Sequence, residues 1–210
     1  MVHRASLFEY MGSPIFSKGI QLRGRFGEKV VSLALTNMGY AVSAPLPSKD
    51  VNGNDCGAGS ESHDLYIAGK DGGKSECIEV KIGRMYYNTH LRCWVIQFEG
   101  VKSKHHDRLF LVVELPDSYH VFEWGGQGAS TTGKQTECNG ENITVRGSCG
   151  ETDFADATKT ILDKMVKQDN KFIDKFSFEN ETIKRIHEAT TLGVDAYAAS
   201  PLSVLSNCLR

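Results

Sequence analysis

The chain has 210 residues, 40% of them hydrophobic, which is enough to bury the core of a single domain. No apolar stretch approaches the length of a membrane span, and the first residues lead into no apolar signal core, so we expect a cytoplasmic protein with no membrane contact. The formal net charge of −2 gives no overall basic character, so contact with nucleic acid would have to come from local basic segments.

The cysteine pattern indicates the redox environment in which the protein is expected to work. All six are scattered without a C-x-x-C pair, which is typical of reduced thiols in a cytoplasmic protein. A zinc site that includes Cys56 and His63 is disfavoured because tightly paired ligands are missing.

The first predicted element is a helix within residues 24–40. Its apolar residues recur at helical spacing and Gly39 is a suitable stop: Val30, Leu33, Ala34 and Met38. Glu28 lies on a flank of this helix. The polar segment 48–62 that follows is expected to be a surface loop.

Two strand-like runs come next, residues 64–68 and 77–81, separated by the turn signal Asp71-Gly72-Gly73. A hairpin of these runs would bring Asp64 near Glu79. Strand alternation puts Glu79 and Lys81 on one face, opposite the apolar side chains between and beside them.

Three more strands are predicted at 93–98, 109–113 and 119–124, with a turn at Pro116-Asp117. Together with the hairpin they would form a mixed sheet of about four or five strands flanked by helices. The predicted fold class is therefore α/β, in the broader α+β sense.

The remainder of the chain is less regular at first. Residues 125–136 are rich in glycine, hydroxyl and amide side chains, and a nucleotide-binding loop is disfavoured because Gln135 stands where Ser or Thr is needed. Either this segment contacts DNA, or it is a flexible hairpin that ends at 142–145.

An apolar stripe at near-helical spacing then predicts a helical C-terminal part: Ile161, Leu162, Met165, Val166, Phe172, Ile173 and Phe176. A second helix is expected at 181–190.

Local basic and polar residues supply candidate DNA contacts. The cluster at 102–108 is the stronger candidate for phosphate, whereas the lysines between 159 and 175 are interpreted as a solvated helix face. Each histidine of the cluster has a structural alternative. The candidate contacts are Lys102, Lys104, His105, His106, Arg108, Gln127, Lys134, Gln135 and Arg146.

Asp64 followed by Glu79-Val80-Lys81 resembles the motif of the PD-(D/E)xK nuclease superfamily, and within it the type II restriction endonucleases. Glu28 matches the acid that many members carry on a helix before the first core strand. His63 replaces the proline of the motif. The resemblance implies a restriction-endonuclease-like core in a single domain, 1–210, with the catalytic core at about 20–124, a loop or hairpin elaboration at 125–150 and a helical part at 151–210.

The resemblance also implies a mechanism. Asp64, Glu79 and the carbonyl of Val80 would hold Mg²⁺, Lys81 would orient or deprotonate the attacking water, and Glu28 would assist from the helix. The implied activity is Mg²⁺-dependent hydrolysis of double-stranded DNA, most simply by a sequence-specific restriction enzyme.

Partners follow from that activity. Cutting both strands of a palindrome predicts a homodimer, and a cognate methyltransferase would act on the same DNA site without being a bound subunit. The alternatives are a structure-specific or repair nuclease, a junction resolvase of the same fold, a DNA-binding module whose acids are structural, and a protein unrelated to nucleic acid in which Glu79 and Lys81 are an exposed ion pair.

Overall fold

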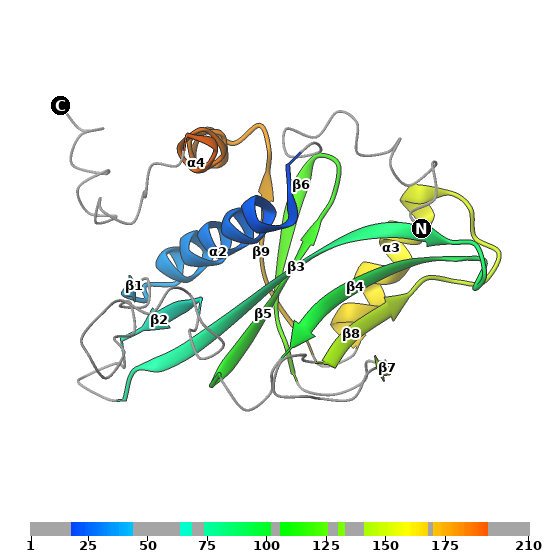
Figure 1. Cartoon of the computed structure of the whole chain (residues 1–210), viewed down its shortest axis with the longest axis horizontal. Helices are drawn as coiled ribbons and strands as arrows, with labels where there is room; N and C mark the ends of the chain where they lie inside the picture. The colour runs from blue at the N-terminus through cyan, green and yellow to red at the C-terminus, as the bar shows by residue number, and fades with distance from the viewer. Residues whose placement is uncertain are drawn as a thin grey trace.

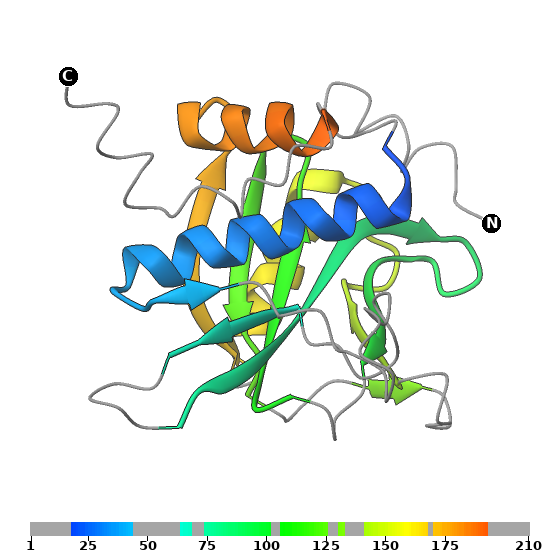
Figure 2. The ribbon, with the colours of Figure 1, turned by 60° about the vertical axis from the view of Figure 1, so that its left-hand side comes forward.

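The computed structural model describes residues 18–43, 64–68, 74–101, 106–125, 130–132, 141–167 and 170–192. These ranges form three helices, α2 (Ile20–Asn37), α3 (Phe154–Lys167) and α4 (Glu181–Thr191). The strands are β1 (Val42–Ser43), β2 (Leu65–Ile67), β3 (Glu76–Asn88), β4 (Cys93–Val101), β5 (Arg108–Glu114), β6 (Ser118–Glu123), β7 (Ser130–Thr132), β8 (Glu141–Arg146) and β9 (Lys171–Ser177). The fold is α/β with one mixed, curled sheet, as Figures 1 and 2 show.

The sheet has nine strands, and its main path runs β7-β8-β4-β3-β5-β6-β9. β2 pairs with β3 beside this path, and β1 pairs with β2. Strands β3 and β5 are parallel, whereas the other pairs are antiparallel. The prediction of about four or five strands was therefore too low, because β1 and the strands from the segments 125–150 and 151–210 also join the sheet.

Strand β9 corrects the prediction of a wholly helical C-terminal part. Helix α3 ends at Lys167, and residues 171–177 instead form a strand that pairs with β6. Asn170 lies between the two elements. Its Nδ2 donates to the Met165 carbonyl at 2.8 Å, and its Oδ1 accepts from the Gly125 amide at 3.1 Å. Short apolar runs fit both the helical period of about 3.6 residues and the strand period of about 2 residues. The spacing of Phe172 and Phe176 could therefore not distinguish a strand from a helix.

Helices cover both faces of the sheet (Figures 1 and 2). One core lies under α2 and α4 and the other under α3, and β5 contributes to both because its side chains alternate. Phe110 and Val112 belong to the first core, whereas Leu109 and Leu111 belong to the second. This two-sided burial explains why the β5 sequence is an unbroken apolar run.

The predicted first helix and its stop are confirmed. α2 starts at Ile20, a little before the predicted segment, and Gly39 takes a positive φ of 84° just beyond its end. None of the helices in the described part of the chain is long and apolar enough to cross a membrane.

Strand β3 determines where a site can form, because it changes partner along its length. Its first residues pair with β2 and its last residues, from Met85 on, pair with β4. β2 uses the edge of β3 opposite β5, since Ile78 pairs with both strands, and in the described ranges no strand pairs with this edge between Ile78 and Met85. The sheet therefore splits at the middle of β3 (Figure 1).

Candidate active site

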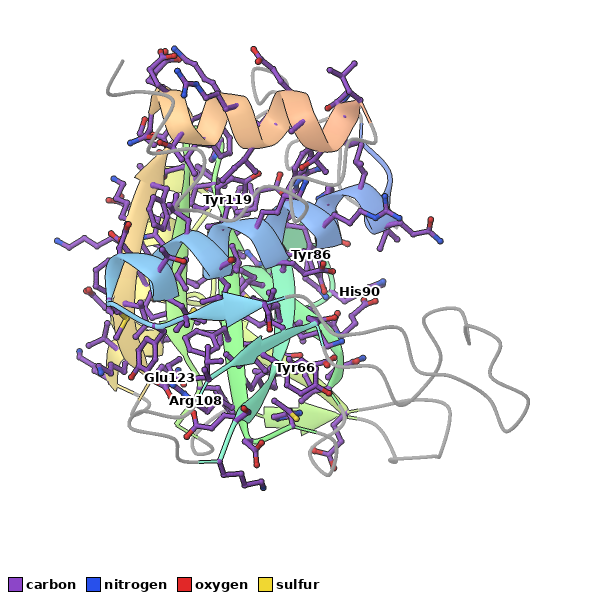
Figure 3. The ribbon with its side chains drawn as sticks, turned by 90° about the vertical axis from the view of Figure 1, so that its left-hand side faces the viewer. Tyr66, Tyr86, His90, Arg108, Tyr119 and Glu123 are labelled. Atoms are coloured by element: carbon purple, nitrogen blue, oxygen red, sulfur yellow. The ribbon has the colours of Figure 1, made fainter. Side chains whose placement is uncertain are left out.

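A cavity of about 540 Å³ lies at the split in the sheet. Residues from α2, β3 and β4 line it together with Asp64, which immediately precedes β2. Tyr86 of β3 belongs to its lining and lies near the start of α2 (Figure 3). The open edge of β3 thus faces a space into which side chains from three elements converge.

The predicted hairpin is present and holds Asp64 against β3. The Asp64 amide donates to the Ile78 carbonyl at 3.0 Å, and the Val80 amide donates to Asp64 Oδ2 at 2.7 Å. Leu65 pairs with Ile78, so the same register sets Asp64 opposite Glu79. The first acid of the motif is therefore fixed beside the second by backbone pairing.

The Val80 carbonyl points toward the same edge as Asp64. In a strand, the amide and carbonyl of one residue face the same neighbour. Since the Val80 amide is bonded to Asp64, the Val80 carbonyl also lies along the open edge of β3. This orientation agrees with the expected use of that carbonyl as a ligand.

Glu79 and Lys81 lie on one face of β3, as the alternation predicted. The Val80 side chain between them is buried on the opposite face, in the core under α2. Lys81 Nζ lies 2.6 Å from Glu79 Oε1, and their side chains are 22% and 14% exposed. The pair is thus largely sheltered, in contrast to the exposed hairpin that one alternative required.

Glu28 reaches the cavity from α2. Its helix lies close to β3 at Gly27, where a Cβ would come within 3.2 Å of Ile82 Cβ. The half-buried Glu28 side chain lines the cavity next to this contact. Burial raises the pKa of the Glu28 carboxyl, and the charge of Glu79 raises it further, against the opposing effect of Arg25.

Asp64 has the most displaced pKa of the set. Burial, followed by the negative charges of Glu79 and Glu28, raises the pKa of its carboxyl from 3.8 to about 7, although the Val80 amide and Lys81 oppose the shift. Three carboxylates thus repel one another at the open edge of β3. A bound cation would relieve that repulsion.

The donor set suits a hard divalent cation. In the described part of the chain no three His, Cys, Asp or Glu side chains form a ready-made metal cage. Mg²⁺ does not need one, because it commonly takes one or two carboxylates and keeps several waters. Asp64, Glu79 and the Val80 carbonyl, all oxygen donors along one edge, fit that requirement.

Three of the predicted DNA contacts can be placed. Arg108 donates to Glu123 Oε1 at 2.6 Å and lies 3.4 Å from Glu76 Oε2, so its half-buried guanidinium is held beside β6 and does not line the cavity (Figure 3). His106 is half-buried before β5, and Arg146 is exposed at the end of β8. The others lie outside the described residues: Lys102, Lys104, His105, Gln127, Lys134 and Gln135.

Sequence reasoning assigned no site role to two arginines and a buried acid near the cavity. Arg23 of α2 and Arg84 of β3 line the cavity, and both contact Glu114, whose side chain is 0% exposed. The available signal was a glutamate that ends the apolar run of β5, a position where a charge needs a buried partner.

No model of a known protein family, no curated protein and no solved structure matches this chain significantly. A functional proposal must therefore rest on the residues that line the cavity.

The Asp64 carboxyl gives a testable pH dependence. Between about pH 4 and pH 7 the folded protein holds a proton on Asp64 that the unfolded chain releases, so the free energy of unfolding falls as pH rises through this window. We expect Asp64→Asn, which keeps an acceptor for the Val80 amide, to raise the melting temperature of the metal-free protein by several degrees at about pH 8.

Thermal unfolding of both proteins in a chelator measures this difference. It should shrink toward zero below about pH 3, where Asp64 is protonated in both states. Mg²⁺ should also reduce it at high pH by stabilising the wild type alone. A difference that does not change with pH would contradict the assigned cause.

Proposed function

We propose that the chain is a Mg²⁺-dependent endonuclease that hydrolyses phosphodiester bonds in double-stranded DNA, most simply as a sequence-specific type II restriction endonuclease of the cytoplasm. The observation that carries the proposal is the register of β2 and β3, which sets Asp64 opposite Glu79 with Lys81 beside it. The resemblance to the PD-(D/E)xK motif adds support, since it concerns these same residues.

Each side chain has a proposed role. Asp64, Glu79 and the Val80 carbonyl would hold the Mg²⁺. Bound Mg²⁺ supplies a water of lowered pKa and charge stabilisation at the phosphate oxygens. Lys81, held 2.6 Å from Glu79, orients the attacking water and stabilises the charge that develops on the phosphate. Glu28 lines the cavity from the α2 side and orients this set.

The partners are proposed from the same reaction. Double-strand cleavage at a palindrome needs two sites related by a two-fold axis, so we propose a homodimer. A methyltransferase that modifies the same DNA sequence would protect host DNA without binding to this chain.

The proposal is tested by incubating the purified protein with phage-sized DNA and Mg²⁺, and then sequencing the fragment ends. We expect discrete fragments with reproducible ends and no cleavage when a chelator is present. Random ends would remove the restriction assignment, and preferential cutting of flaps or four-way junctions would favour a repair nuclease or resolvase. DNA that stays intact with Mg²⁺ or Mn²⁺ would overturn the nuclease proposal.

A further inference from the structure

Two arginines share one buried carboxylate beside the proposed active site. Arg23 Nε donates to Glu114 Oε2 at 2.8 Å, and Arg84 Nε donates to Glu114 Oε1 at 2.9 Å. A second guanidinium nitrogen of each arginine also contacts the same oxygen. One carboxylate thus fixes the orientation of two planar cations that come from different elements.

The three residues connect α2, β3 and β5. The Glu114 side chain is 0% exposed, whereas Arg23 and Arg84 are 16% and 17% exposed and both line the cavity. The carboxylate is therefore the inner partner, and the two guanidinium groups lie between it and the cavity.

The positive charge of the two arginines exceeds what is needed to compensate the buried Glu114 carboxylate. A buried carboxylate requires compensation, and one bidentate arginine supplies it. The second arginine leaves the cluster with a net charge of +1 at the wall of a cavity that Asp64, Glu28 and Glu99 also line. A surplus cation in this position matches the negative charge of a nucleic-acid backbone.

The spacing along the elements places the arginines near the carboxylates. Arg84 lies four residues after Val80 on β3, roughly 13 Å along an extended strand. Arg23 lies five residues before Glu28 on α2, roughly 7.5 Å along a helix. A separation on the order of 10 Å equals about three nucleotides of rise along one DNA strand.

We propose that Arg23 and Arg84 form a clamp for a backbone phosphate of the bound DNA, about two or three nucleotides from the phosphate that reacts. Glu114 is the positioning residue that keeps both guanidinium groups turned to the cavity. The inference rests on the proposed function, because it assigns the substrate backbone to the same cavity. It explains how an acidic protein presents a local cation to DNA.

The test compares DNA binding of variants across salt concentrations, with Ca²⁺ replacing Mg²⁺ and a short duplex as the probe. The main variant is Arg84→Gln, which removes one guanidinium, lowers the charge of the cluster from +1 to 0 and leaves Arg23 to compensate Glu114. The control is Lys159→Gln, which removes an exposed cation on α3, on the opposite face of the sheet. Thermal unfolding of each protein checks that it is folded.

The clamp predicts a specific change in the salt dependence. Between about 50 and 200 mM salt, the Arg84→Gln protein should bind with a slope of log K against log salt that is smaller by about 0.9, the value for one lost phosphate contact. Its affinity at low salt should fall roughly tenfold. The Lys159→Gln protein should keep the wild-type slope and affinity.

The outcomes separate the clamp from the nuclease proposal. A folded Arg84→Gln protein with wild-type slope and affinity, alongside wild-type cleavage of DNA, would overturn the clamp alone. A wild type that neither binds nor cleaves DNA would overturn both. If the Arg84→Gln protein does not fold, Arg23→Lys and Arg84→Lys decide, since each keeps the charge but loses the planar guanidinium that contacts Glu114 through two nitrogens. Unchanged affinity in both lysine variants would contradict the clamp.

Discussion

Asp64→Asn and Glu79→Gln are each expected to slow DNA cleavage by roughly 10³-fold or more in Mg²⁺, because each removes one of the two carboxylates proposed to hold the cation. Both changes are nearly isosteric. The amide oxygen that Asp64→Asn introduces can still accept from the Val80 amide, so the β2–β3 hairpin should persist. DNA affinity should not fall, since each change removes a negative charge from the proposed metal site.

Single-turnover cleavage at saturating DNA, measured over a Mg²⁺ series, separates loss of metal affinity from loss of chemistry. The matched control is Glu99→Gln, a carboxylate that lines the same cavity from β4 and has no proposed part in holding the cation. Its rate should stay within about threefold of the wild type. Full cleavage by either Asp64→Asn or Glu79→Gln would contradict the assigned metal site.

The features of the candidate site that could be predicted from sequence are those formed within one hairpin or one helix. Asp71-Gly72-Gly73 between two alternating runs indicated the β2–β3 pairing, and alternation alone put Glu79 and Lys81 on one face. The helix that carries Glu28 was visible from its apolar period and from Gly39. Each of these inferences depends on interactions within one hairpin or one helix, whose geometry is fixed by short-range rules.

The parts that were missed depend on pairings between distant segments. Strand β9 forms because β6 offers it an edge, and nothing in residues 171–177 identifies that partner. The cluster of Arg23, Arg84 and Glu114 joins residues up to 91 positions apart. The split of the sheet likewise arises because β3 changes partner from β2 to β4. Such contacts are set by tertiary packing, which single-sequence periodicity does not contain.

β4 packs tightly against β3 at Gly83, and a side chain there is expected to force the two strands apart. A Cβ at Gly83 would lie 2.9 Å from the Gln97 carbonyl oxygen, from Ile96 Cγ1 and from Phe98 Cε1. The first of these is backbone and cannot rotate away. β4 would therefore have to move, and with it the wall of the cavity that Gln97 and Glu99 line.

We expect Gly83→Ala to lower the free energy of unfolding by about 2 to 3 kcal/mol, in the range of an overpacked core, and the melting temperature by roughly 5 to 10 °C. Gly24→Ala is the matched control: it adds the same methyl group to the lining of the same cavity, but its Cβ meets nothing within 4 Å. Since Gly24 lies inside α2, alanine there should stabilise by about 0.5 to 1 kcal/mol. Thermal unfolding should thus give shifts of opposite sign for the two variants, and a wild-type melting temperature for Gly83→Ala would contradict the close crossing of β3 and β4.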